Sequence, residues 1–364
     1  MKRFSCDGCQ QPVFFESVQC TRCGQRLAYL PNHAVMSGLV PDDASKTPTS
    51  WRANAPITEG ARYRLCQNDR EYGVCNWSIP MDDPEPYCRA CRLNKIIPNL
   101  SDPGAQAAWY RLETAKRRLL HTLITLELPV EGKDERPDGG LAFSFMKDVS
   151  REGGPKVFTG HKDGLVTIDI AETDDPAREK TRVELGEAYR TVLGHFRHEI
   201  GHYYWDQLVS GSQRLEPFRA LFGDERADYA EAQQRHYTWG PPADWPHRFV
   251  SSYASMHPFE DWAETWAHYL HMTDTLETAR AHGLAPARAQ PPATSQVTGL
   301  DVGRSDPHAF NELLGAWVPV TIALNDLNRS MGLPDPYPFV LSDAAVAKLR
   351  FVHDVIQAWS GASA

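Results

Sequence analysis

The feature that most restricts the fold of this chain is the position of its eight cysteines, which all fall in the first quarter of 364 residues. Four of them form two C-x2-C pairs separated by ten residues, namely Cys6, Cys9, Cys20 and Cys23. In a zinc ribbon, each such pair directs two thiolates at one tetrahedral metal ion. The spacing therefore predicts a first structural zinc ribbon over residues 6–23, with these four thiolates as ligands.

The remaining cysteines replace one C-x2-C pair with a wider C-x8-C spacing; they are Cys66, Cys75, Cys88 and Cys91. Their number and the closing C-x2-C pair still predict a second structural zinc site over residues 66–91. A disulfide framework would require an exported chain, and scattered buried thiols would not come in C-x2-C pairs. Segments this short cannot bury enough surface to fold unaided, so we expect zinc to stabilise a double zinc-ribbon region over residues 1–100.

The distribution of charge argues against a nucleic-acid partner. Residues 1–100 hold 12 Lys and Arg against 10 Asp and Glu, whereas residues 101–364 hold 26 against 37. Phosphate binding needs clustered basic charge. Four thiolates around one Zn²⁺ also leave about two negative charges at each ribbon, which cancels the small basic excess of the first segment. Polar residues interrupt the first thirty positions and no apolar run reaches the length of a membrane span, so we expect a cytoplasmic protein with no membrane partner.

The remaining chain has the periodicity of an α+β domain in which helices dominate. Residues 101–128 carry apolar side chains at helical spacing after a Ser-Asp-Pro start, which predicts a long amphipathic helix. Two short segments, 141–147 and 164–172, are rich in β-branched or aromatic residues and predict paired strands. One long helix is predicted over residues 174–208. Two strands followed mainly by helices favour the α+β class for a domain over residues 101–364.

Several further elements follow from the same signals. Helices are predicted at 215–235, 258–273, 308–328 and 342–359. Residues 31–60 and 283–302 are rich in Pro and small polar residues and are predicted as loops. The acidic segment 222–232, FGDERADYAEA, is interpreted as a solvated helix start capped by Asp224 rather than as a cation site, because acidic residues favour first turns.

The segment HFRHEIGH, residues 195–202, lies inside the predicted helix 174–208. In a helix His198 and His202 project from one face, with about 6 Å between their Cβ atoms, which suits two imidazoles on one zinc ion. Glu199 is then placed to reach a metal-bound water and act as a general base. Gly201 costs about 1 kcal/mol in a helix interior, so a packing or functional demand must offset it.

The third ligand is expected from the segment 253–271. It carries Glu260 and Glu264 four residues apart on one predicted helix face. A carboxylate from this segment completes a set of two histidines and one glutamate that leaves a position open for water. Glu264 can then hydrogen-bond a histidine ligand and fix its tautomer. A solvated acidic face explains the segment less well, because tryptophans such as Trp262 and Trp266 make it strongly aromatic.

Two other histidines compete for a place at the metal. His195 shares the helix face of the motif, but we favour it as a residue behind the ligands, because zinc sites of this type take their third ligand from another segment. His257 lies three residues before Glu260, and Pro258 between them makes its direction unpredictable. Whether either histidine touches the metal stays open, and a fourth protein ligand would favour a structural site.

The motif HEIGH followed by Y-x6-E-x3-E resembles the gluzincin metallopeptidases of the anthrax lethal factor type. This resemblance implies that Glu260 binds the zinc, that Glu264 supports a ligand, and that Tyr253 donates to the oxyanion of the tetrahedral intermediate. Outside these motifs the chain shows no similarity to that toxin.

A second resemblance covers nearly the whole chain. The segments FSCDGCQQPVFFESVQCTRCGQRLAYLP, YRTVLGHFRHEIGHYYW, FGDERADYAEA and HPFEDWAETWAHYLH resemble a bacterial family of zinc-binding metallopeptidases with an N-terminal zinc ribbon. The resemblance implies a zincin-like catalytic domain over residues 101–364 and a peptide or protein substrate.

The sequence therefore supports two hypotheses. The first is a zinc-dependent metallopeptidase with one catalytic and two structural zinc ions, which hydrolyses peptide bonds through a zinc-bound water activated by Glu199. The second is a non-catalytic binding or regulatory protein that zinc stabilises and that captures a partner with its ribbons. The number of protein ligands on the third zinc distinguishes the two.

Overall fold

The computed structural model describes residues 3–42, 48–150, 157, 159–284 and 307–360. The chain folds into two compact units, Met1–Asp174 and Asp175–Ala364. The predicted α+β class is confirmed, with helices dominating and cysteine clusters near the N-terminus. Among the described residues, no helix combines the length and apolarity that a membrane crossing requires. Beyond residue 284, the loop predicted at 283–302 lies outside the described residues.

The first unit begins with a five-stranded antiparallel sheet in sequence order. Its strands are β3 (Arg26–Leu30), β4 (Val35–Pro41), β5 (Trp51–Ala53), β6 (Arg62–Leu65) and β7 (Ser78–Pro80). A separate hairpin joins β1 (Phe4–Ser5) to β2 (Pro12–Val13). The prediction of a loop over residues 31–60 is therefore wrong. In β4 four consecutive residues, 36–39, are buried, so the strand lacks the alternation by which a half-buried strand is found in a sequence.

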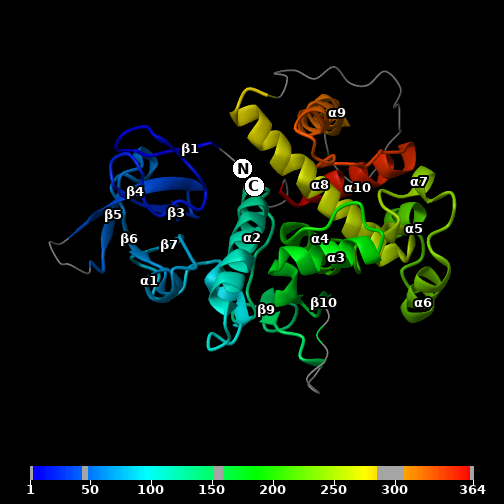
Figure 1. The fold of residues 1–364 in the computed structure, drawn as a ribbon, viewed down its shortest axis with the longest axis horizontal. Coiled ribbons are helices and arrows are strands. Elements are labelled where there is room, and N and C mark those ends of the chain that lie inside the picture. Colours follow the sequence, from blue (N-terminus) through cyan, green and yellow to red (C-terminus); the bar gives the residue numbers. More distant parts are fainter. Residues whose placement is uncertain (1–2, 43–47, 151–156, 158, 285–306, 361–364) are drawn as a thin grey trace. The chain divides into compact units, whose positions relative to one another are not determined.

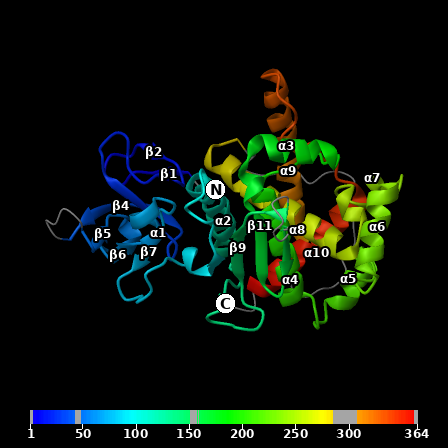
Figure 2. The ribbon, with the colours of Figure 1, turned by 60° about the horizontal axis from the view of Figure 1, so that its bottom comes forward.

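A second sheet in this unit has the order β10-β11-β9-β8. The two predicted strands are confirmed as β9 (Ala142–Met146) and β11 (Leu165–Asp169), which pair in parallel. The shorter strands are β8 (Asn94–Ile96) and β10 (Gly160–Lys162). The predicted long helix is confirmed as α2 (Ala105–Thr125), and it lies beside β9 and β11 (Figure 2). Lys116 of α2 has its Nζ over the rings of Phe143 and Phe145 of β9, at 5.6 and 5.5 Å.

The described part of the second unit is helical. Its α-helices are α3 (Asp175–Glu184), α4 (Val192–Leu208), α5 (Leu215–Phe222), α6 (Tyr229–Trp239), α7 (Trp245–Arg248), α8 (Pro258–Ala281), α9 (Pro307–Ser330) and α10 (Asp343–Ser360). The predicted helix 174–208 is interrupted between α3 and α4. Gly186 there has φ +65°, and the Thr191 side chain caps α4 by accepting a hydrogen bond from Gly194 N.

The predicted helix 215–235 is also two helices, α5 and α6. Asp224 is not the cap. Its carboxylate instead pairs with Arg226, at 2.7 Å from Nη2. The Asp228 side chain caps α6 by accepting from Glu231 N at 2.9 Å, which makes Tyr229 the first residue of the helix.

Helices α4 and α8 pack directly against each other (Figure 1). A Cβ atom built on Gly201 of α4 would lie 2.9 Å from Ala263 Cα and 3.2 Å from Trp266 Cβ of α8. Trp262 Nε1 donates a hydrogen bond of 2.8 Å to the Gly201 carbonyl oxygen. Close packing of the two backbones is the demand that keeps a glycine inside this helix, and it places the HEIGH motif beside the glutamates of α8.

Candidate metal centre

The first four cysteines meet at one point in the first unit. Their four Sγ atoms all lie within 4.8 Å of one another, and both the Cys6–Cys23 and the Cys9–Cys20 sulfur pairs are 3.6 Å apart. A tetrahedral ion with Zn–S bonds near 2.3 Å needs sulfurs about 3.8 Å apart. The thiols therefore fit a zinc ion. Cys23 of this cluster is exposed and Cys9 is partly exposed.

The other four cysteines, Cys66, Cys75, Cys88 and Cys91, form a second group whose members are all buried. The Cys75 and Cys88 sulfurs are 3.6 Å apart, which again fits tetrahedral zinc. Burial and the neighbouring thiols raise the pKa of Cys88 well above its ordinary value, so thiolates here need a compensating cation.

Helix α2 brings charged side chains to this second cluster. Glu113, Lys116 and Arg117 are at most 1% exposed, and Lys116 Nζ donates to Glu113 Oε1 at 2.9 Å. Burial disfavours the charged Arg117 guanidinium, but the thiolates and Glu113 beside it raise its pKa overall. The Arg117 guanidinium therefore lies close to the negative charge that four thiolates would carry.

A third group of metal donors joins α4 to α8 in the second unit. One ligand atom from each of His198, His202 and Glu260 lies within 4.8 Å of the other two. Glu260 Oε2 is 2.9 Å from His198 Nε2, and Glu260 Oε1 is 3.6 Å from His202 Nε2. Tetrahedral zinc with bonds of about 2.0–2.1 Å needs donors about 3.4 Å apart, so these three side chains fit the ion.

Glu264 supports this group from the same face of α8. Its Oε1 is 2.7 Å from His198 Nδ1, and its Oε2 accepts a hydrogen bond of 2.6 Å from Ser251 Oγ. Burial opposes a charge on His198, but hydrogen bonds to Glu260 and Glu264 raise the pKa of its ring well above the ordinary value. The two carboxylates thus favour a positive charge at the point where the donors meet, as a metal site requires.

Glu199 and Tyr253 lie next to these donors. Burial raises the pKa of Glu199, against the opposing effect of His198 and His202, and its side chain is largely out of solvent. Tyr253 belongs to the 3₁₀ turn η5 (Tyr253–Ser255), and its ring centroid is 5.9 Å from that of His198. Burial and then Glu260 raise the pKa of Tyr253, so its phenol keeps its proton at neutral pH and can donate.

The two competing histidines stand outside the three-donor group. Burial and Arg190 lower the pKa of His195 to about 3, so this ring is neutral. His257 caps α8, its Nδ1 accepting from Phe259 N at 3.2 Å, and its Nε2 therefore donates to the carbonyl oxygen of Ala227 at 3.0 Å. Both ring nitrogens of His257 are thus used by backbone groups.

Tyr229 is a residue that the sequence analysis missed. Its hydroxyl donates a hydrogen bond of 2.9 Å to Glu260 Oε1. The only sequence signal is its place after Asp228 in FGDERADYAEA, and no local spacing connects it to a glutamate 31 residues later. Ser251, the partner of Glu264, was missed for the same reason.

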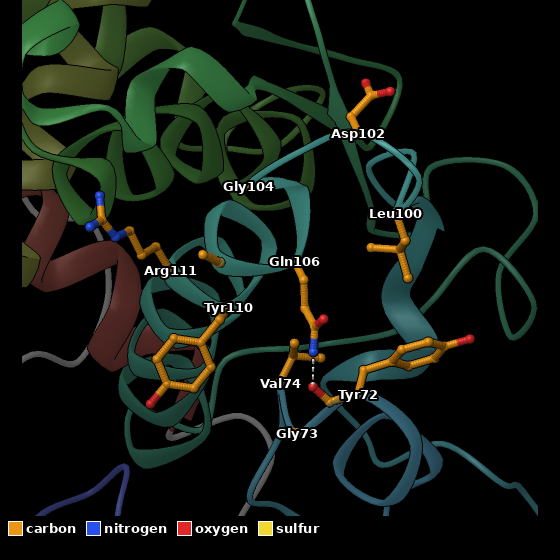
Figure 3. Close-up of a pocket in the computed structure, with 10 residues that line it drawn as sticks. Tyr72, Gly73, Val74, Leu100, Asp102, Gly104, Gln106, Tyr110 and Arg111 are labelled. Carbon is orange, nitrogen blue, oxygen red and sulfur yellow. Dashed lines mark hydrogen bonds between the residues drawn. The ribbon is translucent and has the colours of Figure 1, made fainter.

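A cavity of about 690 Å³ lies elsewhere, in the first unit. It is lined by residues around the end of helix α1 (Gln67–Tyr72) and the start of α2, among them Tyr72, Gln106 and Tyr110 (Figure 3). Gln106 Nε2 donates to the Tyr72 carbonyl oxygen at 2.7 Å across it. None of the candidate metal ligands lines this cavity.

Comparison with known proteins also indicates zinc binding. A family model described as "Putative zinc-binding metallo-peptidase" matches residues 105–355, and a zinc-ribbon domain model matches residues 3–102. The chain belongs to this zinc-binding metallopeptidase family. An uncharacterized protein from Mycobacterium tuberculosis is 43% identical over 357 residues, which cover 98% of this chain and 95% of that protein. An uncharacterized protein from Mycobacterium bovis matches with the same identity and coverage, and no solved structure matches.

The family match assigns zinc binding to both parts of the chain. The ribbon model spans both cysteine clusters, and the metallopeptidase model spans α4 and α8 with the three-donor group. The metallopeptidase match begins at residue 105, the first residue of α2, whereas α2 packs within the first compact unit. The domain boundary at residues 100–101 stays a prediction.

Proposed function

We propose that this protein is a zinc-dependent metallopeptidase that hydrolyses a peptide or protein substrate at the site formed by α4 and α8. The observation that carries the proposal is the convergence of His198, His202 and Glu260 within 4.8 Å, next to the buried carboxyl of Glu199. Two histidines and one glutamate are the protein ligands of catalytic zinc sites that keep one position for water.

Zinc, when bound, supplies a Lewis acid that polarises a carbonyl and makes water a stronger acid. In this proposal Glu199 accepts the proton of the attacking water and later donates it to the leaving amine. Burial raises the pKa of Glu199 above that of an ordinary glutamate, which is the direction that suits a group that accepts and later donates a proton.

Tyr253 is proposed as the donor to the oxyanion. The support is its position 5.9 Å from the His198 ring, centroid to centroid, and the raised pKa that keeps its hydroxyl protonated. Removing a single donor of this kind typically costs about 3–4 kcal/mol of transition-state stabilisation. Tyr253→Phe is therefore expected to lower kcat more than it changes KM.

His198 owes its orientation to Glu264 in this proposal. The Glu264 carboxylate accepts from His198 Nδ1 at 2.7 Å, which leaves Nε2 with its lone pair directed to the metal. Ser251 holds the other oxygen of Glu264 at 2.6 Å. His195 is proposed as a neutral residue behind the ligands. The ribbon zincs are proposed as structural, and a cytoplasmic location stays a prediction.

The test is a proteome-wide cleavage screen that compares the wild type with Glu199→Gln. The variant is expected to keep all its zinc and to lose cleavage, because Gln occupies the same volume but cannot accept the proton. Glu184→Gln, which changes an exposed glutamate of α3, is the matched control and should cleave as the wild type does. Full turnover by Glu199→Gln, or no peptidase activity in the zinc-loaded wild type, would overturn the proposal.

A further inference from the structure

The two carboxylate oxygens of Glu260 have different neighbouring side chains. Oε2 lies 2.9 Å from His198 Nε2, whereas Oε1 accepts the 2.9 Å hydrogen bond from the Tyr229 hydroxyl and lies 3.6 Å from His202 Nε2. The side chain is only 3% exposed, so the second oxygen has little access to water as a partner. A buried carboxylate oxygen without a donor would be costly.

The direction of the Tyr229 hydrogen bond is fixed by its chemistry. An ionised carboxylate has no proton to donate, so the Tyr229 hydroxyl donates and Glu260 Oε1 accepts. A charge-assisted bond of this kind is stronger than one between neutral groups.

A hydrogen bond and a ring contact join the segment around Tyr229 to His257, which caps α8, and α8 also carries Glu260. His257 Nε2 donates to the carbonyl oxygen of Ala227 at 3.0 Å, and the rings of His257 and Tyr229 lie 5.2 Å apart in an edge-to-face contact. Just before Ala227 in the chain, Glu225 forms an ion pair with Arg219 of α5. Arg219 Nη2 donates to Glu225 Oε1 at 2.5 Å, and Arg219 Nε donates to Glu225 Oε2 at 2.9 Å. The contacts with His257 at the N-terminus of α8 therefore fix the position of Tyr229, the first residue of α6.

We propose that Tyr229 is a positioning residue for the metal site: its hydroxyl holds Glu260 Oε1 and so orients the Glu260 carboxylate toward His198 and His202, and His257 keeps Tyr229 in place. This inference rests on the zinc site proposed above. Its chemistry is that of an outer hydrogen bond that orients a metal ligand, and losing such a bond typically lowers metal affinity about 10- to 100-fold.

The test uses the full-length protein with zinc in both cysteine clusters and the third site emptied by mild chelation. That site is then titrated with Zn²⁺ against a fluorescent zinc indicator, and separately loaded with Co²⁺ to record its visible spectrum. Tyr229→Phe removes only the hydroxyl. It is expected to raise the zinc dissociation constant about 10- to 100-fold and to shift the cobalt bands, because the Glu260 carboxylate then loses the hydrogen bond that orients it.

Two further variants separate this role from a merely structural one. Tyr237→Phe removes the hydroxyl of an exposed tyrosine on the same helix and should change neither the affinity nor the spectrum. His257→Asn keeps a side chain that can cap α8 but loses the bond to Ala227, so its cobalt spectrum should shift in the same direction as that of Tyr229→Phe.

The outcomes separate the two proposals. A wild-type protein that binds no third metal ion contradicts the zinc site itself. A wild type that binds the ion, together with a Tyr229→Phe variant of unchanged affinity and spectrum, overturns only the role of the tyrosine. If Tyr229→Phe fails to fold, the His257→Asn spectrum still decides, because an unshifted spectrum there would contradict the proposed link through Ala227.

Discussion

Gly201 of α4 lies so close to Ala263 of α8 that a methyl group at residue 201 would sit 2.9 Å from the Ala263 Cα atom. Alanine normally stabilises a helix interior by about 1 kcal/mol over glycine. Here the helices would have to move apart, and overpacking of this kind costs about 1–3 kcal/mol. We therefore expect Gly201→Ala to lower the thermal unfolding temperature and to weaken zinc binding at the third site, as calorimetry and zinc titration would show. A more stable variant would contradict the close packing of α4 and α8.

Glu113 is predicted to be essential for the stability of the first unit. It is fully buried with Lys116, whose Nζ is 2.9 Å from its Oε1. Removing one partner of a buried ion pair typically destabilises a protein by about 3–5 kcal/mol. Glu113→Gln should therefore lower the free energy of unfolding by about this amount in denaturant titration. Glu179→Gln, which breaks an exposed pair with Arg182, should leave it nearly unchanged.

The two cysteine clusters should lose zinc in a fixed order. Cys23 of the first cluster is exposed, whereas all four cysteines of the second cluster are buried. A thiol-modifying reagent reaches exposed thiolates first, so the first cluster should release its zinc before the second. Native mass spectrometry during the reaction, with the modified cysteines mapped by peptide analysis, would follow this order. Early modification of Cys66 or Cys88 would contradict it.

The ion pair of Glu225 with Arg219 should make stability depend on pH. Hydrogen bonds from Arg219, which outweigh the effect of burial, lower the pKa of Glu225 below the ordinary value of a glutamate. A carboxyl whose pKa is lower in the folded state stabilises the protein above the unfolded pKa of about 4.3, and this contribution is lost as the pH falls through the folded pKa. The stability difference between wild type and Glu225→Gln should therefore shrink from pH 7 to pH 3. A difference that is constant over this range would refute the assignment.

The sequence predicted those features that depend on local chemistry. Cysteine spacing predicted two groups of four thiols, and the structure brings the thiols of each group together. The helix α2 and the strands β9 and β11, which periodicity predicted, are confirmed. The assignment of individual ligands and of the base stays a prediction, although His198, His202 and Glu260 do converge. The cysteine pairs and the two histidines rest on spacings of a few residues, which helix and turn geometry convert directly into distances, whereas the choice of Glu260 rests on the resemblance to gluzincins.

The features that were missed depend on contacts distant in the sequence or on patterns without alternation. The strand β4 has four consecutive buried residues and was predicted as a loop. The role of Tyr229 requires α6 and α8 to meet. Tyr229 and Glu260 are 31 positions apart, and the residues between them contain no signal for that contact. Asp224 was predicted to cap a helix, but Arg226 two residues later engages its carboxylate, and Asp228 serves as the cap.

The zinc content of the purified protein tests the central claim most directly. The wild type is expected to hold three zinc ions per chain, and a His198→Ala/His202→Ala variant should hold two, because only the third site depends on these rings. Inductively coupled plasma mass spectrometry combined with native mass spectrometry gives both numbers. Two zinc ions in the wild type, or three in the double variant, would contradict the account.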